Sequence, residues 1–365
     1  MVKRLAIVVS DLHMGAGHAP GQVNPHDDFF LDERFAELVG YYNDGHYRDA
    51  EVELIINGDF FDLLKVPVDG VWPDEVTEAV SMNKLKSCID GHPAVIDALR
   101  AFIETPGKRI TYLPGNHDMD FHFAGCRRLF CAAITGRPED PRLKFVVNAD
   151  RYELPEGVQV IHGHQYEPIH SFNYEEIVLT KDLDQPVLNL PWGSFFVLNV
   201  VNPLKYERPY LDQVRPFYPF LIFGLLTDFR FTLRVMFRSF YYFFKTRLYK
   251  VANRKTYFRK FVKLLREDLV FFPDLERFAE RILRTSFGTR LVVMGHSHYP
   301  MVRSYGPDKL YINTGTWTRM ISLTIGNMGS TLKPAYAVIE LDGGVPRAKL
   351  YHWLGAHRPF EQIDL

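Results

Sequence analysis

Five short apolar runs in this chain of 365 residues each lead directly into residues that can bind a metal ion. The runs are rich in β-branched residues, which is typical of strands buried on both faces in a sheet covered by helices. Open sheets of that kind bind ligands beyond the carboxyl ends of their strands. The five segments are Asp11-Leu12-His13, Gly58-Asp59, Gly115-Asn116-His117-Asp118, His162-Gly163-His164 and Gly295-His296-Ser297-His298. We therefore expect them to converge at one edge of a layered α/β domain.

The pattern of segments along the chain predicts one discontinuous core with an insertion. Strands are expected at 5–10, 53–57, 109–113, 145–147, 152–154, 158–161, 291–294, 310–313, 335–341 and 349–353. Helices are expected at 28–43 and 73–104, the second with a break at 91–93. Between about 165 and 287, strand signals vanish and aromatic residues crowd in. Because the late strands carry His296 and His298, they must rejoin the early ones. We predict a core of 1–165 and 288–365 and a helical insertion at 166–287.

The amino-acid composition excludes few classes of protein. A hydrophobic share of 47% is ordinary for a globular protein, and a formal net charge of −1 does not mark the whole molecule as a binder of polyanions. Three cysteines are too few for a disulfide framework, so we expect a reducing compartment or use in the core. The apolar stretch at the N-terminus is too short for a signal peptide. We expect a cytoplasmic location.

The ligand types predict a pair of divalent metal ions. In an extended chain, Asp11 and His13 would lie on one face and bind one ion. Asp59 follows a strand of the same sheet and can offer one oxygen to each ion. In the Gly-His-Ser-His segment, a turn would direct His296 and His298 to different ions. Each motif alone has an ordinary explanation as a cap or a turn. Together they indicate two adjacent metals, whose common use is displacement at phosphorus.

At these residues the chain resembles the calcineurin-like metallophosphoesterase superfamily, over roughly residues 4–165 and 290–355. The residues that carry the resemblance are Asp11, His13, Asp59, Asn116, His117, His162, His296 and His298. The stretches Gly-Asp-Phe-Phe-Asp at 58–62 and Tyr-Ile-Asn-Thr-Gly-Thr-Trp at 311–317 are also similar to the family's pattern. The resemblance implies a four-layer αββα sandwich.

The resemblance also implies a division of roles. Metal one would be held by Asp11, His13, Asp59 and His298, and metal two by Asp59, Asn116, His162 and His296. His117 would face the substrate and protonate the leaving oxygen or stabilise the transition state. Asp62 or Asp118 would orient it, and the family's pairing favours Asp62. His162 is preferred to His164 as a ligand because it directly ends its strand. Mn is the expected metal, with Fe, Zn or Co as alternatives.

The insertion carries a local excess of positive charge. Between residues 203 and 270, roughly fifteen Lys or Arg stand against about five Asp or Glu, among many aromatic residues. This pattern predicts a basic amphipathic helix. It would serve as a structural cap, as a helix or acyl-chain groove at an anionic membrane, or as a nucleic-acid surface. Nucleic acid is the least favoured partner, because Gly-rich and RNP-type signatures are missing.

A narrower resemblance bears on the substrate. UDP-2,3-diacylglucosamine pyrophosphatases of the same superfamily have similar Asp-Leu-His-Met-Gly and Gly-Asp-Phe-Phe-Asp motifs and an inserted helical lid that holds acyl chains. This chain departs from them at His117, where they have Arg, and at His164, where they have Asp. The leading hypothesis is a di-metal hydrolase that cleaves a phosphoester or pyrophosphate bond of a lipid-like or nucleotide-lipid substrate, peripheral to the inner face of the membrane. The alternative is a soluble phosphodiesterase or phosphatase for nucleotides or phosphoproteins with a structural cap.

Overall fold

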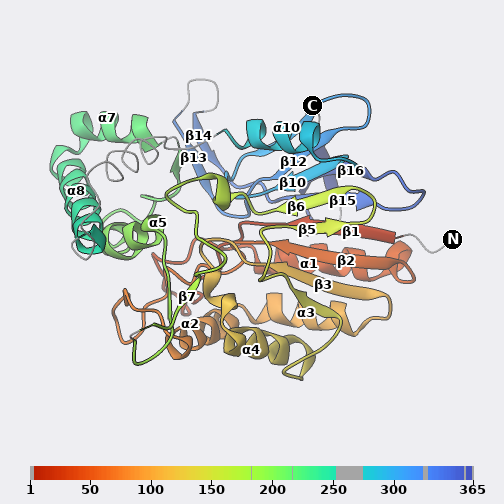
Figure 1. Cartoon of the computed structure of the whole chain (residues 1–365), viewed down its shortest axis with the longest axis horizontal. Coiled ribbons are helices and arrows are strands. Elements are labelled where there is room, and N and C mark those ends of the chain that lie inside the picture. Colours follow the sequence, from red (N-terminus) through yellow and green to blue (C-terminus); the bar gives the residue numbers. More distant parts are fainter. Residues whose placement is uncertain are drawn as a thin grey trace.

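Two β-sheets form the centre of the molecule (Figure 1). The computed structural model describes residues 4–181, 183–215, 217–251, 274–323, 328–356 and 359–363. The larger sheet has the strand order β17-β16-β15-β1-β2-β3-β4. Its strands are β1 (Arg4–Val9), β2 (Glu51–Asn57), β3 (Lys108–Leu113), β4 (Leu143–Phe145), β15 (Ala335–Glu340), β16 (Arg347–Trp353) and β17 (Phe360–Ile363). Strands β1 to β4 run parallel, so the chain leaves β1, β2 and β3 at the same edge.

The second sheet has the order β11-β12-β10-β6-β5. Its strands are β5 (Tyr152–Leu154), β6 (Val158–Ile161), β10 (Leu291–Met294), β11 (Pro300–Ser304) and β12 (Leu310–Thr314). Strand β10 pairs in parallel with both β6 and β12. The late part of the chain therefore rejoins the early part, as the positions of His296 and His298 predict.

Helices cover the outer faces of both sheets, which confirms the four-layer αββα sandwich (Figure 1). One apolar cluster lies between the sheets and includes Val8, Ile55, Val160 and Val293. A larger cluster lies under the helices α1 (Asp32–Asn43), α2 (Glu78–Gly91), α3 (Pro93–Glu104) and α4 (Ala124–Thr135). Helix α10 (Leu275–Thr285) packs on β10 and β12 through a third cluster. Short helical turns occur at η1 (Gly45–Tyr47), η2 (Met119–His122) and η3 (His164–Tyr166). All three cysteines are buried and unpaired.

The expected insertion is mainly helical. Its elements are β7 (Val178–Leu179), β8 (Val187–Leu188), α5 (Trp192–Phe196), η4 (Val197–Val201), α6 (Asn202–Lys205), β9 (Val214–Arg215), α7 (Phe217–Thr227) and α8 (Phe229–Val251). Helices α7 and α8 lie to one side of the sheets (Figure 1). A separate apolar cluster, which includes Leu204, Leu211, Phe231 and Val235, holds them to the segment before them. Within the described residues, no helix is long and apolar enough to cross a membrane.

Several expected boundaries are wrong, for local reasons. Helix α1 begins at Asp32 instead of residue 28, because Asp27 Oδ1 accepts a hydrogen bond from the Phe29 amide and stabilises a turn there. Helix α2 begins after Thr77, whose hydroxyl caps the Val80 amide, so the helix does not start at residue 73.

Strand β4 ends at Phe145, and three two-residue strands interrupt the segment that was expected to lack strands. One of them, β9, pairs with β13 (Met320–Ser322), which pairs in turn with β14 (Gly329–Thr331). Helix α10 falls inside the expected insertion, although it forms the outer layer on the second sheet. Residues 252–270 of the expected basic helix lie outside the described residues. The division at 166 and 287 stays a prediction.

Candidate metal centre

The parallel strands of the two sheets bring the predicted ligands together. Asp11 follows β1, Asp59 follows β2 and Asn116 follows β3 in the larger sheet. In the second sheet, His162 follows β6 and His296 follows β10, and the last residues of these two strands are paired. Each side chain is thus carried on a loop beyond the carboxyl end of a strand, the place where open α/β sheets bind ligands.

The backbone of these loops is strained. Positive φ angles occur at Asp11 (55°), His13 (51°), Asp59 (50°), His296 (66°) and His298 (64°). Such a conformation costs on the order of 1 kcal/mol for each non-glycine residue, and this strain typically gathers at functional sites. Among the described residues, Asp69 alone shares it outside this group. The expectation that Asp11 and His13 lie on an extended chain is therefore wrong, because a left-handed turn brings them together instead.

Asp11, His13 and His298 form one group of ligand atoms that lie within 4.8 Å of one another. His298 Nε2 lies 3.4 Å from Asp11 Oδ1 and 3.1 Å from His13 Nε2. The Asp11 carbonyl accepts hydrogen bonds from the Thr316 hydroxyl and the Trp317 amide, which hold its backbone in place. One carboxylate and two imidazoles are a suitable set for a divalent transition metal.

Asp59, His162 and His296 form a second group of the same kind. Asp59 Oδ2 lies 3.2 Å from His162 Nε2 and 3.8 Å from His13 Nε2, so this carboxylate stands between the two groups. Burial raises the pKa of Asp59, but the positive charges of His162 and His117 lower it well below its usual range. Asp59 is therefore ionised and able to bind cations on both sides.

The orientation of His162 indicates that a cation belongs at this place. Its Nδ1 donates to the Asn57 carbonyl at 2.7 Å, so the lone pair of Nε2 faces the Asp59 carboxylate. Two facing lone pairs repel unless a proton or a metal ion lies between them. Burial lowers the pKa of His162, but Asp59 raises it to about 10, so either a proton or a metal ion at Nε2 satisfies this contact. Asn116 Oδ1 is a second buried acceptor that has no hydrogen-bond partner among the described residues.

Two glycines allow this close approach. An added Cβ at Gly58 would lie 2.4 Å from His162 Nδ1, and one at Gly115 would lie 2.2 Å from Asp59 Oδ1. Real Cβ atoms essentially never approach so closely. The glycines in the Gly-Asp and Gly-Asn-His-Asp segments are therefore needed for packing at the site.

His117 is paired with Asp62 at the same edge. Its Nδ1 lies 2.8 Å from Asp62 Oδ1, and its side chain is 15% exposed. Burial lowers the pKa of His117, but the charges of Asp62 and Asp59 raise it to about 9. The Asp118 carboxylate does not contact the His117 ring in this way. It accepts hydrogen bonds from the Phe60 amide, the Tyr112 hydroxyl and the Gly115 amide. Of the two candidates, Asp62 is therefore the one in contact with the His117 ring.

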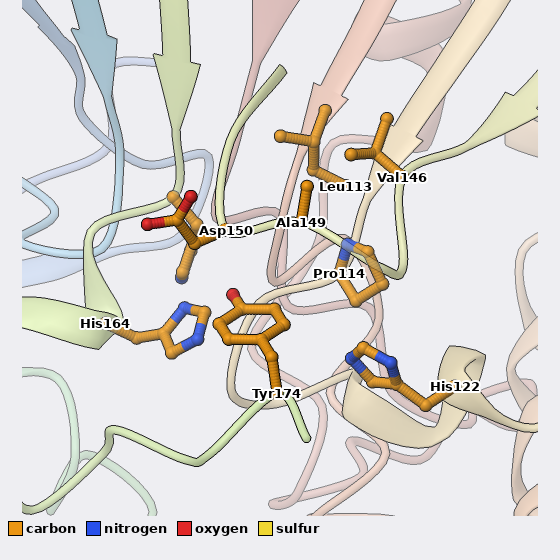
Figure 2. Close-up of a pocket in the computed structure, with 9 residues that line it drawn as sticks. Leu113, Pro114, His122, Val146, Ala149, Asp150, His164 and Tyr174 are labelled. Atoms are coloured by element: carbon orange, nitrogen blue, oxygen red, sulfur yellow. The ribbon is translucent and has the colours of Figure 1, made fainter. Parts of the chain in front are cut away.

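The His164 ring lies beside the His162 ring, with their centroids 5.3 Å apart. Its ring stacks on Phe172, and neither of its nitrogens has a hydrogen-bond partner among the described residues. Figure 2 shows His164, Tyr174 and His122 around a small pocket that His162 also lines. Because His164 belongs to neither ligand group, the geometry favours His162 over His164 as the ligand.

Two residues near the ligands were not anticipated. Glu167 Oε2 lies 2.5 Å from His296 Nε2, and His170 Nδ1 lies 3.4 Å from the Asn116 amide nitrogen. A histidine that binds a metal through one ring nitrogen commonly donates the other to a carboxylate, and Glu167 fits that role. Both residues follow β6 on an irregular loop. No motif spacing predicts that Glu167 and His170 lie near the metal ligands. Their position shortly after His164 is only a weak indication.

The sequence model for calcineurin-like phosphoesterases matches residues 6–224, more than half of this chain. No curated protein matches it. Among solved structures, it is similar to zinc-bound Vps29 from Entamoeba histolytica, with 10% identity over 99% of this chain and 98% of that chain and a TM-score of 0.31. It is also similar to a 5′-nucleotidase precursor from Thermus thermophilus, with 12% identity over 95% of this chain and 54% of that chain and a TM-score of 0.35. A third similar structure is the calcineurin-like phosphoesterase YfkN from Bacillus subtilis, with 11% identity over 96% of this chain and 90% of that chain and a TM-score of 0.32. Because these identities and TM-scores are low, only the family match bears on what the chain does.

Proposed function

This chain belongs to the calcineurin-like phosphoesterase family and is a metal-dependent phosphoesterase, and from that premise we propose that it cleaves a phosphoester or pyrophosphate bond of an amphiphilic substrate at an anionic membrane surface. The observation that carries the hydrolytic part is the position of the buried Asp59 carboxylate, whose Oδ2 lies 3.2 Å from His162 Nε2 and 3.8 Å from His13 Nε2. The ligand groups on both sides of Asp59 supply side chains for two ions.

The donor set fits two divalent ions. Asp11, His13 and His298 would hold one, His162, His296 and Asn116 would hold the other, and Asp59 would bridge them. When bound, such a pair lowers the pKa of a water molecule and neutralises phosphate charge. Manganese is the metal that we propose, because the ligands combine carboxylate and amide oxygens with imidazole.

His117 acts on the leaving group in this proposal. Asp62 holds its Nδ1, so Nε2 is the nitrogen left to face the substrate. Held in this way by Asp62, His117 can donate a proton to the leaving oxygen. The charge of the protonated ring stabilises negative oxygens on phosphorus as the bond breaks.

The exposed side chains of α7 and α8 support a membrane-facing role for the inserted segment. Phe237 is 69% exposed, Phe240 60% and Tyr241 61%, although large aromatic side chains are usually buried. Phe223, Leu226, Phe229 and Phe244 are also exposed. The other side of α8 is already occupied, because Phe231 and Val235 pack in their own apolar cluster. The exposed residues are therefore not required for that packing.

Positive charge accompanies this apolar surface. Arg230 and Lys245 are exposed on α8, whereas Arg234 is paired with Glu207, and the described part of this helix contains no Asp or Glu. Aromatic and basic residues together suit the headgroup level of an anionic bilayer. A substrate whose phosphate is attached to an acyl chain would be presented at that level, near an enzyme held on the surface.

Co-sedimentation tests the membrane part. The protein is mixed at low salt with vesicles of phosphatidylglycerol and phosphatidylcholine, and with vesicles of phosphatidylcholine alone. We expect binding to the anionic vesicles only. The double variant Phe237→Ser/Phe240→Ser should bind at least about tenfold more weakly, because a buried Phe side chain contributes about 2 kcal/mol.

The matched control is Phe287→Ser, which removes a fully exposed aromatic residue from a different part of the chain. It should leave binding unchanged. The proposed membrane binding is wrong if the wild-type protein does not bind anionic vesicles. It is also wrong if the double variant and Phe287→Ser lose binding equally. Hydrolysis of a soluble phosphodiester would then favour a nucleotide or phosphoprotein substrate with a structural cap.

A further inference from the structure

A buried cluster of charged side chains joins the inserted segment to the Asp62–His117 pair. Lys65 Nζ lies 3.1 Å from Asp62 Oδ2, 2.6 Å from Asp28 Oδ2 and 2.6 Å from Asp212 Oδ2. Lys65 is 6% exposed. Its ammonium group is thus surrounded by carboxylates from three separate parts of the chain, one of which, Asp212, belongs to the insertion.

Lys205 of helix α6 is the second cation of the cluster. Its Nζ lies 2.8 Å from Asp28 Oδ2 and 2.6 Å from Asp212 Oδ1, and the side chain is fully buried. Lys205 therefore shares two carboxylates with Lys65, and no contact between it and Asp62 is observed among the described residues. Buried charges are tolerated only when they are paired, so these groups hold one another in fixed positions.

Lys65 contacts the Asp62 carboxylate oxygen that His117 does not contact. Asp62 Oδ1 binds His117 Nδ1 at 2.8 Å, whereas Oδ2 lies 3.1 Å from Lys65 Nζ and 3.2 Å from His13 Nδ1. With both oxygens engaged, the carboxylate cannot rotate about its terminal bond. If Lys65 lost its charge, Oδ2 would keep only the longer contact with His13, and the orientation of the carboxylate would be held less firmly.

We propose that Lys65 is a positioning residue of the hydrolytic reaction, which holds Asp62 so that Asp62 aims the His117 ring at the substrate, and that Asp212 of the insertion holds Lys65 in turn. This inference rests on the proposed function. It gives the insertion a part in catalysis that is separate from any contact with a membrane. The chain of contacts runs from Asp212 through Lys65 and Asp62 to His117.

Lys65 lies behind Asp62 and does not face the substrate directly. Removing its charge should therefore lower kcat and leave KM nearly unchanged. Loss of a residue that orients a catalytic or ligating side chain typically costs about 10- to 100-fold in activity. We expect a fall in kcat of that size for Lys65→Met.

The experiment compares Lys65→Met with Lys205→Met, using bis(4-nitrophenyl) phosphate as the substrate and Mn²⁺ as the metal. Both changes replace a buried ammonium by an apolar chain of similar length, and both leave Asp28 and Asp212 short of one cation. They differ in whether a contact with Asp62 is lost. Lys205→Met should keep kcat within about threefold of the wild type, and circular dichroism and melting temperature report whether each variant folds.

A double-mutant cycle with Asp62→Asn separates positioning from general damage. If Lys65 acts through Asp62, adding Lys65→Met to Asp62→Asn lowers kcat no further, because residues that act as a unit are not additive. Equal losses in Lys65→Met and Lys205→Met, or additive losses in the cycle, would overturn the inference while the proposed hydrolysis stands. A wild-type protein that cleaves neither this diester nor 4-nitrophenyl phosphate nor a pyrophosphate with Mn²⁺ would overturn the proposed function, and the inference with it.

A milder variant covers the case in which Lys65→Met does not fold. Asp212→Asn weakens the hold on Lys65 from the insertion and should lower kcat severalfold. Its control is Asp228→Asn, which breaks an exposed ion pair with Arg208 in the same segment. If Asp212→Asn keeps full activity, the insertion has no part in positioning, and the inference is wrong.

Discussion

Gly115→Ala tests the geometry of the metal centre with a single added methyl group. The new Cβ would lie 2.2 Å from Asp59 Oδ1, 2.7 Å from the Asp59 backbone nitrogen and 2.8 Å from His162 Nε2. Gly115 is not among the residues with positive φ, so alanine suits its backbone, and the effect is one of space alone. Normal contact begins near 3.4 Å, so the Asp59 carboxylate must move by about 1 Å.

A displacement of that size at a reacting centre costs about 100-fold in rate. We expect Gly115→Ala to lower kcat for bis(4-nitrophenyl) phosphate by about that factor and to raise the Mn²⁺ concentration needed for half-maximal rate. The control is Gly40→Ala in helix α1, where the added Cβ meets nothing within 4 Å. It should keep full activity and stabilise the protein by about 0.5–1 kcal/mol. Wild-type activity and metal dependence in Gly115→Ala would refute the convergence of Asp59 and His162.

Three further changes test separate parts of the account. His117→Ala should retain its metal by mass spectrometry but lose about 10²- to 10⁴-fold in kcat, and intact turnover would remove this residue from the mechanism. Asp59→Asn should lower the occupancy of both ions, and loss of one alone would argue against a bridge. Burial lowers the pKa of His92, but Asp27 and Asp32 raise it to about 9, so its stabilising effect is fully present below pH 6.5 and is lost as the pH rises through 9. The difference in unfolding free energy between wild type and His92→Gln, from urea titrations, should therefore shrink by up to roughly 3 kcal/mol over that range, and a constant difference would contradict the pairing.

The sequence predicted the parts of the fold that depend on apolar periodicity. The strands with ligands at their ends are close to their expected positions, because a buried parallel strand needs an unbroken apolar run. The edge strands β11 and β17 were not foreseen. An edge strand pairs with a neighbour on one side only and is less buried, so its apolar pattern in the sequence is weak. Helix α10 was assigned to the insertion because its burial against β10 depends on contacts that are distant in sequence.

The candidate site was predictable in residue type but not in geometry. Motif order indicated that Asp11, Asp59 and His296 would meet, whereas the left-handed backbone at all three is visible only in the structure. The contacts of Glu167 with His296 and of Lys65 with Asp62 were missed, because both residues lie in irregular segments where spacing carries no information. Such partners are set by tertiary packing and not by local pattern.

Anomalous diffraction from crystals grown with Mn²⁺ tests the central claim most directly. The account predicts two peaks, one among Asp11, His13 and His298 and one among His162, His296 and Asn116, with the Asp59 carboxylate between them. A single peak, or manganese bound elsewhere while these side chains keep their positions, would contradict it.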